Sequence, residues 1–238
     1  MSSGRPRGVE ALVRWEHPTR GLLPPAEFIE LAERSDLIIG LGRIVLEQAC
    51  RQLAAWRSSL GEHAPTEVAV NVSPTQLHQP GFAAQVQAVL EVSGLPPQCL
   101  VLEVTESTVM RDVDAAIEVL TDLRAIGIRI SIDDFGTGHS SLARLHELPT
   151  DQIKIDQSFV QASHDDTTLL ELMITLASRI GLDIIAEGIE TPAQLDTLRR
   201  MGCPSGQGYL LDRPLEVGAV TAVFAPEACK PDRGPLAA

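Results

Sequence analysis

Short segments of β-strand character alternate with longer helical segments along almost the whole chain, and this alternation is the feature that most constrains the fold. Seven segments rich in β-branched and other apolar residues are predicted as strands, namely 8–15, 67–72, 100–105, 128–133, 152–155, 183–186 and, more weakly, 208–211. Apolar residues spaced by three and four predict helices between them, as in 115–126 and 168–180. Strands joined by helical crossovers pair in parallel, so the sequence predicts an α/β fold.

Several of the predicted helices carry their own start and stop signals. Thr191 and Ser73 are each followed by proline, which is typical of an N-cap with proline in the first helical position. Gly127, Gly181 and Gly202 stand where helices should end. These signals support helices between the strands and indicate neither an internal repeat nor a linker.

Two architectures fit seven strand and helix units in 238 residues: a (β/α)₈ barrel of the TIM type with one strand unaccounted for, or a doubly wound open sheet. The distribution of polar residues separates the two. Polar side chains lie within or just after six of the predicted strands, at Glu10, Asn71, Glu103, Asp133, Asp134, Lys154 and Glu187. A barrel brings the carboxyl ends of all strands to one rim, whereas an open sheet would not gather six strands at one point, so we expect the barrel.

The carboxylates of this set indicate a metal site. Glu10 and Glu103 lie inside apolar runs, where a lone charge is costly unless a cation compensates it. Carboxylate and amide oxygens without histidine or cysteine suit Mg²⁺ or Mn²⁺. The adjacent pair Asp133 and Asp134 allows one carboxylate to bridge two ions, an arrangement that suits attack of water on a phosphodiester.

Each of these residues also has an ordinary structural explanation when taken alone. A single glutamate in a strand is usually an edge residue or a salt-bridge partner. Asn71 could form a turn, and Lys154 could lie along an apolar surface with its ammonium in water. Only the joint pattern predicts a functional site.

Composition excludes other classes of function. The chain has 32 acidic and 19 basic residues, a formal net charge of −13, and only 3% aromatic residues. A protein that holds long nucleic acid needs a basic face or stacking aromatics, so long nucleic acid is not an expected partner. The four cysteines form no CxxC pair, and no run of apolar residues is long enough to span a membrane, so we expect a cytoplasmic protein with reduced thiols.

Seven short motifs occur together in the order that defines one known family. They are EALVRW at 10–15, NVS at 71–73, EVTE at 103–106, DDFGTG at 133–138, KID at 154–156, AEGIET at 186–191 and QGY at 207–209. From about residue 8 to residue 214 the chain resembles the EAL family of cyclic di-GMP phosphodiesterases. The resemblance implies a modified TIM barrel and metal-dependent hydrolysis of cyclic di-GMP to linear pGpG.

The same resemblance implies roles for individual residues. A first Mg²⁺ or Mn²⁺ ion would be held by four residues, Glu10, Asn71, Glu103 and Asp133. Asp133 would bridge to a second ion, which Asp134 would also bind. Glu187 and Lys154 would act with Glu10 in catalysis by positioning and polarising the attacking water, with either Glu187 or Lys154 as the base.

Four further residues receive supporting roles from the resemblance. Arg14 would pair with a substrate phosphate, and Gln207 and Glu190 would support the substrate or the metal ligands. Glu106 would order the loop from Asp134 to Ser140, a loop that in the family couples dimerisation to metal binding. A homodimer through this loop is therefore a predicted assembly.

The chain departs from the family pattern at its amino end and at two single positions. His139 replaces a usual aromatic residue, and Pro204 stands where an acid is common. The family strand that precedes Glu10 is absent, so the predicted barrel has two unpaired edges. We expect a short polar segment at 1–7, the EAL domain at 8–225 and a mobile tail at 226–238, within a longer protein that carries an upstream cyclase or sensory domain.

Two other functions compete with an active phosphodiesterase. One is a catalytically weak or inactive receptor that binds cyclic di-GMP and acts through protein contacts, which the absent first strand favours. The other is an unrelated Mg²⁺-dependent barrel enzyme. The complete set of predicted metal ligands favours the active enzyme.

Overall fold

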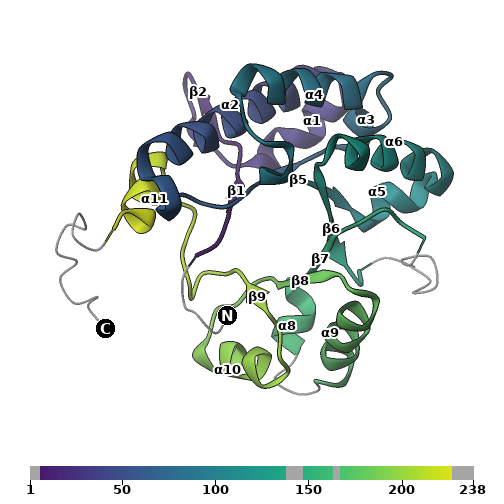
Figure 1. Cartoon of the computed structure of the whole chain (residues 1–238), viewed down its shortest axis with the longest axis vertical. Coiled ribbons are helices and arrows are strands. Elements are labelled where there is room, and N and C mark those ends of the chain that lie inside the picture. The colour runs from purple at the N-terminus through teal and green to yellow at the C-terminus, as the bar shows by residue number, and fades with distance from the viewer. Residues whose placement is uncertain (1–5, 138–146, 163–166, 227–238) are drawn as a thin grey trace.

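A computed structural model describes residues 6–137, 147–162 and 167–226 of the chain. Its core is a sheet of seven strands in the order β1-β4-β5-β6-β7-β8-β9, and every neighbouring pair is parallel (Figure 1). The strands are β1 (Val9–Ala11), β4 (Val68–Asn71), β5 (Leu100–Thr105), β6 (Arg129–Phe135), β7 (Gln152–Ile155), β8 (Asp183–Ala186) and β9 (Ser205–Gly206). The predicted parallel α/β fold of the barrel type is therefore confirmed.

Helices follow the strands as crossovers on the outside of the sheet. The longer helices are α2 (Leu37–Leu60), α4 (Phe82–Ser93), α6 (Val113–Ile126), α9 (Thr168–Ile180), α10 (Pro192–Arg200) and α11 (Val217–Phe224). The short helical turns are η1 (Pro25–Glu27), α1 (Ile29–Arg34), η2 (Gly61–His63), α3 (Pro74–Leu77), η3 (Pro97–Cys99), α5 (Glu106–Arg111) and α8 (Gln157–Ala162). In Figure 1, α2, α4 and α6 lie on one side of the strands, and α8, α9 and α10 on the other. No helix in the described ranges has the length and apolar character needed to cross a membrane.

The predicted helix signals act as expected. Ser73 and Thr191 each form a capping box, in which the N-cap side chain and the side chain of the third helical residue satisfy each other's backbone N–H groups. Gly127 and Gly181 end α6 and α9 in the left-handed conformation, which glycine adopts without steric cost. These local rules explain why the crossover helices begin and end where they do.

The last predicted strand, 208–211, is wrong in position. The last strand of the sheet is instead Ser205–Gly206, and the segment after it forms a turn. Gly208 packs directly on Ile189, since a Cβ atom at 208 would lie 2.2 Å from the Ile189 nitrogen. Leu210 N–H donates to the Ile189 carbonyl, so this segment pairs with the loop after β8 rather than with the sheet.

The first predicted strand, 8–15, is too long. β1 ends at Ala11, and Trp15 begins a separate antiparallel hairpin of β2 (Trp15–His17) and β3 (Gly21–Leu23). His17 Nδ1 accepts hydrogen bonds from the backbone N–H groups of Thr19 and Arg20 and so stabilises the turn. A side chain that caps a turn leaves no signal in hydrophobic periodicity, which explains the error.

β1 and β9 form the two edges of the described sheet and face each other across a cavity of about 1110 Å³. The cavity is lined by both edge strands and by apolar residues of α11, among them Val217 and Val220. Trp56 Nε1 on α2 donates to Thr221 Oγ1 on α11 at 2.8 Å, which fixes α11 beside α2 (Figure 1). The sheet is thus curved like a barrel wall and opens sideways between β1 and β9.

The amino ends of three strands are tied together by one ion-pair cluster. Arg129, the first residue of β6, pairs with Glu67 just before β4 and with Asp183, the first residue of β8. The side chains of Arg129 and Glu67 are only 20% and 15% exposed. Partly buried pairs are costly to break because the remaining charge loses its partner.

We predict that Arg129→Met lowers the free energy of unfolding by about 1–3 kcal/mol, because it leaves the Glu67 carboxylate partly buried without its cation. Chemical denaturation followed by circular dichroism measures this change. Arg34→Met, which breaks an exposed pair with Glu30, is the matched control and should cost less than about 1 kcal/mol. Equal effects of the two substitutions would contradict the proposed role of Arg129.

Candidate active site at the carboxyl end of the sheet

Parallel pairing brings the predicted polar residues together at the carboxyl end of the sheet. They come from six strands or the residue just after them: Glu10 from β1, Asn71 from β4, Glu103 from β5, Asp133 and Asp134 from β6, Lys154 from β7, and Glu187 after β8. Asn71 stands opposite Glu103 in the register of β4 and β5, and Thr105 stands opposite Asp133 in that of β5 and β6. Residues up to 177 positions apart in the sequence therefore share one site.

Lys154 lies at the centre of this group. Its side chain is 2% exposed, and its Nζ atom contacts four carboxylates. The distances are 2.8 Å to Glu187 Oε1, 3.0 Å to Glu103 Oε2, 3.3 Å to Asp133 Oδ1 and 3.5 Å to Glu10 Oε2. We call Lys154 and these four acids the carboxylate cluster.

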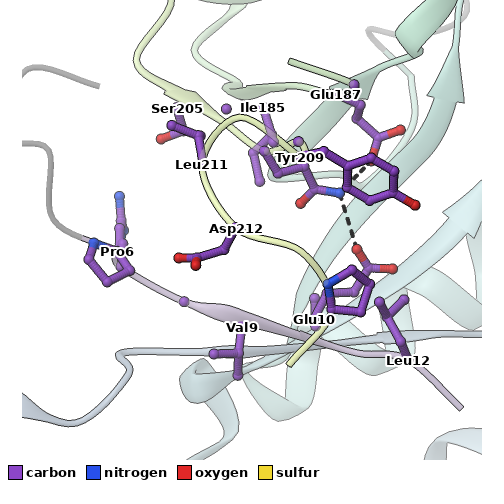
Figure 2. Close-up of a pocket in the computed structure, with 18 of the residues that line it drawn as sticks. Pro6, Val9, Glu10, Leu12, Ile185, Glu187, Ser205, Tyr209, Leu211 and Asp212 are labelled. Carbon is purple, nitrogen blue, oxygen red and sulfur yellow. Dashed lines mark hydrogen bonds between the residues drawn. The ribbon is translucent and has the colours of Figure 1, made fainter. Parts of the chain in front are cut away.

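Two amide side chains fix the orientation of the carboxylates. Asn71 Nδ2 donates to Glu10 Oε1 at 2.8 Å. Gln207 Nε2, which follows β9, donates to Glu10 Oε2 at 3.2 Å and to Glu187 Oε1 at 2.8 Å. In Figure 2, dashed lines join the labelled Glu10 and Glu187 side chains to this amide. Gln207 thus links the two edges of the sheet through side chains where the backbone does not.

The pKa values of Glu10 and Glu103 shift in opposite directions because their surroundings differ. Burial opposes the ionisation of Glu10, but the nearby Lys154 ammonium and the hydrogen bonds from Asn71 and Gln207 outweigh it, so its pKa is lowered. For Glu103, burial dominates over Lys154, and its pKa lies well above the ordinary value. One ammonium shared by four carboxylates cannot offset the burial of all of them.

The pKa values of Lys154, Glu187 and Asp134 also depend on burial and on the neighbouring charges. Burial disfavours the Lys154 ammonium, yet attraction to Glu103 and the other acids raises its pKa, so Lys154 stays charged. Burial raises the pKa of Glu187 to about 7 against the pull of Lys154. Burial and the negative charge of Asp133 raise the pKa of Asp134. Such perturbed groups gathered in a cavity are typical of functional sites.

The backbone of β6 is distorted where it supplies two adjacent acids. The register with β7 shifts between Ile132 and Phe135, and Asp134 has a left-handed φ of 54°. Its backbone N–H donates to Asp133 Oδ1 at 2.9 Å. Consecutive residues of a regular strand point to opposite faces, so this distortion is what allows both aspartates to reach the same rim.

The donor set fits a hard divalent cation. Asp133, Asp134 and Glu187 each offer a carboxylate oxygen, and these oxygens all lie within 4.8 Å of one another. Glu10, Glu103 and the Asn71 amide lie beside them and add further oxygens. Carboxylate and amide oxygens are the ligands that Mg²⁺, Mn²⁺ and Ca²⁺ prefer, so the site can hold a metal ion of this class.

Glu106 supports the turn that follows the two aspartates. This buried residue at the start of α5 accepts a hydrogen bond from the Gly136 N–H at 2.7 Å. Gly136 has a φ of +101°, and a Cβ atom there would lie 2.3 Å from Met173. Residues 138–140 of this loop, including His139, lie outside the described residues, so the predicted dimer contact stays a prediction.

Arg14 and Glu190 line the wider cavity but lie outside the carboxylate cluster as the structure describes it. The exposed Arg14 guanidinium donates to the Val13 carbonyl at 2.8 Å. The backbone N–H of Glu190 donates to Gln194 Oε1 at 2.9 Å, and its side chain is exposed.

Three residues around the site were not predicted as functional. Asp156 lies near enough to Asp134 to raise its pKa, and Tyr209 and Arg213 line the cavity. The Arg213 guanidinium lies 4.7 Å above the centre of the Tyr209 ring, and Tyr209 is 56% exposed and stands over Glu10 in Figure 2. The sequence signal was available for two of them, because Asp156 lies in the KID motif and Tyr209 in the QGY motif.

Comparison with known proteins finds close relatives that are much longer than this chain. Two come from Pseudomonas aeruginosa: the bifunctional diguanylate cyclase/cyclic di-GMP phosphodiesterase MucR is 46% identical over 92% of this chain, and the cyclic di-GMP phosphodiesterase NbdA is 44% identical over 92%. The aligned regions cover 32% and 28% of these relatives, so the chain spans about a third or less of their length.

The fold and the motifs agree with solved structures. The MucR phosphodiesterase in complex with c-di-GMP superposes with a TM-score of 0.85 at 45% identity, covering 90% of this chain and 87% of the other. The family model of the EAL domain matches residues 1–214. The parallel sheet, the acids at its carboxyl end and this match together place the chain in the EAL domain family.

Proposed function

We propose that this chain is a phosphodiesterase that hydrolyses cyclic di-GMP to linear pGpG with Mg²⁺ or Mn²⁺ as cofactor. The observation that carries the proposal is the convergence of four carboxylates on Lys154 beside Asn71 and Asp134, at the rim of a large cavity. Relatives that match over 92% of the chain are named as cyclic di-GMP phosphodiesterases, which supports the choice of substrate.

The metal ligands in this proposal are the acids and the amide of the rim. Glu10, Asn71, Glu103 and Asp133 would hold one ion, and Asp133 with Asp134 would hold a second. When bound, such ions lower the pKa of water and neutralise charge on the phosphate oxygens. The positive charge of the bound ions would also allow a chain of net charge −13 to bind an anionic substrate.

The hydrolysis requires two proton movements. Because pGpG carries a 5′ phosphate, water adds to phosphorus and the bond from phosphorus to a ribose 3′ oxygen breaks. The water must lose a proton to an acceptor, and the 3′ oxygen must gain one, which the protonated acceptor or a solvent water molecule would supply. Lys154 is an ammonium surrounded by carboxylates and can donate but not accept, which leaves Glu187 as the proton acceptor. Lys154 would then orient the water, and Glu10 would act through the metal.

The remaining rim residues would bind the substrate. Arg14 would pair with a phosphate, and Gln207 would hold Glu10 and Glu187 in register while the ligand enters. Glu190 would contact the ligand from the cavity wall. The domain limits at 8–225, the homodimer through the loop after Asp134 and an upstream cyclase or sensory domain stay predictions.

We predict that the purified protein converts cyclic di-GMP to pGpG in the presence of Mg²⁺ or Mn²⁺, as followed by chromatography. Glu10→Gln and Asp133→Asn should each lower kcat/KM by more than about 100-fold, because each removes a metal ligand. Glu91→Gln, on the exposed face of α4, is the matched control and should retain activity. Binding of cyclic di-GMP without turnover would contradict the proposed phosphodiesterase activity and favour a receptor function.

We predict that Arg14→Ala raises KM for cyclic di-GMP by about 10–100-fold with a much smaller change in kcat, because a charged hydrogen bond to phosphate is lost from both ground and transition states. Arg20→Ala removes an exposed arginine from the nearby hairpin and should leave KM unchanged. Steady-state kinetics separates the two parameters. A fall in kcat at constant KM would contradict the binding role of Arg14.

We predict that Glu106→Ala weakens Mn²⁺ binding by about 10–100-fold, because the Gly136 N–H that positions the turn after Asp134 loses its acceptor. Isothermal titration of the folded variant with Mn²⁺ measures this affinity. Glu118→Ala on the exposed face of α6 is the control. A lower melting temperature with unchanged Mn²⁺ affinity would show that Glu106 supports only the fold.

A further inference from the structure

Lys154 is unusual both in this chain and in its surroundings. Only two of the 19 basic residues are lysines, and Lys154 is the only one that the structure describes. It is buried, and its one ammonium lies within 3.5 Å of oxygens from four carboxylates. A compact charge with three rotatable N–H donors can serve several converging acids, whereas the planar guanidinium of arginine is suited to one carboxylate.

The four acids would repel one another without this ammonium. Glu103 and Asp133 come from the adjacent strands β5 and β6, whereas Glu10 comes from β1 and Glu187 follows β8. Their oxygens surround one Nζ atom in a largely buried site, where like charges repel one another more strongly than in water. The Asn71 and Gln207 amides orient two of the acids but carry no charge.

The ammonium contacts the same residues that are proposed to hold the first metal ion. Glu10, Glu103 and Asp133 are shared between Lys154 and that ion, whereas Glu187, at 2.8 Å, is the closest partner of Lys154 and has a different proposed role. With the metal ligands proposed above, a divalent ion and the ammonium therefore compete for three carboxylates, and Glu187 stays with Lys154.

We propose that the Lys154 ammonium is an internal counter-ion that assembles the carboxylate ligands before a metal ion arrives, so that metal binding exchanges one cation for another. The exchange releases Glu10, Glu103 and Asp133 to the ion and leaves Lys154 paired with Glu187. The identity of the ion rests on the proposed function, but the role of Lys154 in the metal-free protein does not. Lys154 is in this respect a positioning residue for the site.

The test compares wild type with Lys154→Met, which keeps the length of the side chain and removes its charge. In metal-free protein the substitution should lower the melting temperature by about 5 °C or more, because the acids lose their counter-ion. At saturating Mn²⁺ the melting temperatures of Lys154→Met and wild type should become nearly equal. By the thermodynamic cycle, Mn²⁺ must then bind the variant more tightly, by about tenfold, as measured by isothermal titration of chelator-treated protein.

Two further variants control for charge and for folding. Arg43→Met removes one positive charge from the exposed face of α2 and should leave the affinity for Mn²⁺ unchanged. Lys154→Arg keeps the charge and should fall between wild type and Lys154→Met. If Lys154→Met folds only with Mn²⁺ and unfolds on chelation, the proposal is supported. If it fails to fold even with Mn²⁺, the exchange is overturned, because the ion did not replace the missing charge.

The outcomes separate this inference from the proposed function. If Lys154→Met binds Mn²⁺ no more tightly than wild type, and the wild-type protein hydrolyses cyclic di-GMP, the exchange is overturned. The proposed phosphodiesterase activity then stands. Mn²⁺ binding by Lys154→Met but not by wild type supports the counter-ion role and contradicts metal-dependent hydrolysis by this chain. Absence of binding by both proteins overturns the exchange as well.

Discussion

Parallel pairing points the carboxyl ends of all seven strands in one direction, and this constraint explains why Glu10 on β1 and Gln207 after β9 share a hydrogen bond. Each crossover helix returns the chain to the same starting side of the sheet. The short strands then place one polar residue each at the rim, or two in the case of β6, so that six strands contribute to a single site. The site is a product of the whole sheet rather than of any one loop.

The carboxylate cluster shows how the fold tolerates concentrated negative charge. Lys154 neutralises part of it, and the amides of Asn71 and Gln207 donate to the oxygens of Glu10 and Glu187. The raised pKa values of Glu103 and Glu187 show that the compensation is incomplete. This excess of negative charge is the physical reason for proposing that the rim binds a divalent cation.

Sequence reasoning succeeded where local chemistry decides the structure. The strands at 100–105, 152–155 and 183–186 have the predicted bounds because buried apolar residues, such as Leu102, Ile153 and Ile184, mark each of them, as the interior of a parallel sheet requires. Ser73 and Thr191 start helices as predicted because proline and the capping side chains act within one turn. The errors at 8–15 and 208–211 have the opposite origin, since a His17 turn and the packing of Gly208 on Ile189 depend on contacts that apolar periodicity does not record.

The amino-acid sequence by itself determined the order of strands and helices, the acids that end the strands and the family to which the chain belongs, because periodicity, capping residues and motifs are local. Tertiary structure alone decided that Lys154 sits among four carboxylates, that Gln207 joins the two edges of the sheet and that a distorted β6 turns Asp133 and Asp134 toward one rim. These features depend on distances between residues far apart in the chain. Such distances are set by strand register and by the curvature of the sheet, which no single segment encodes.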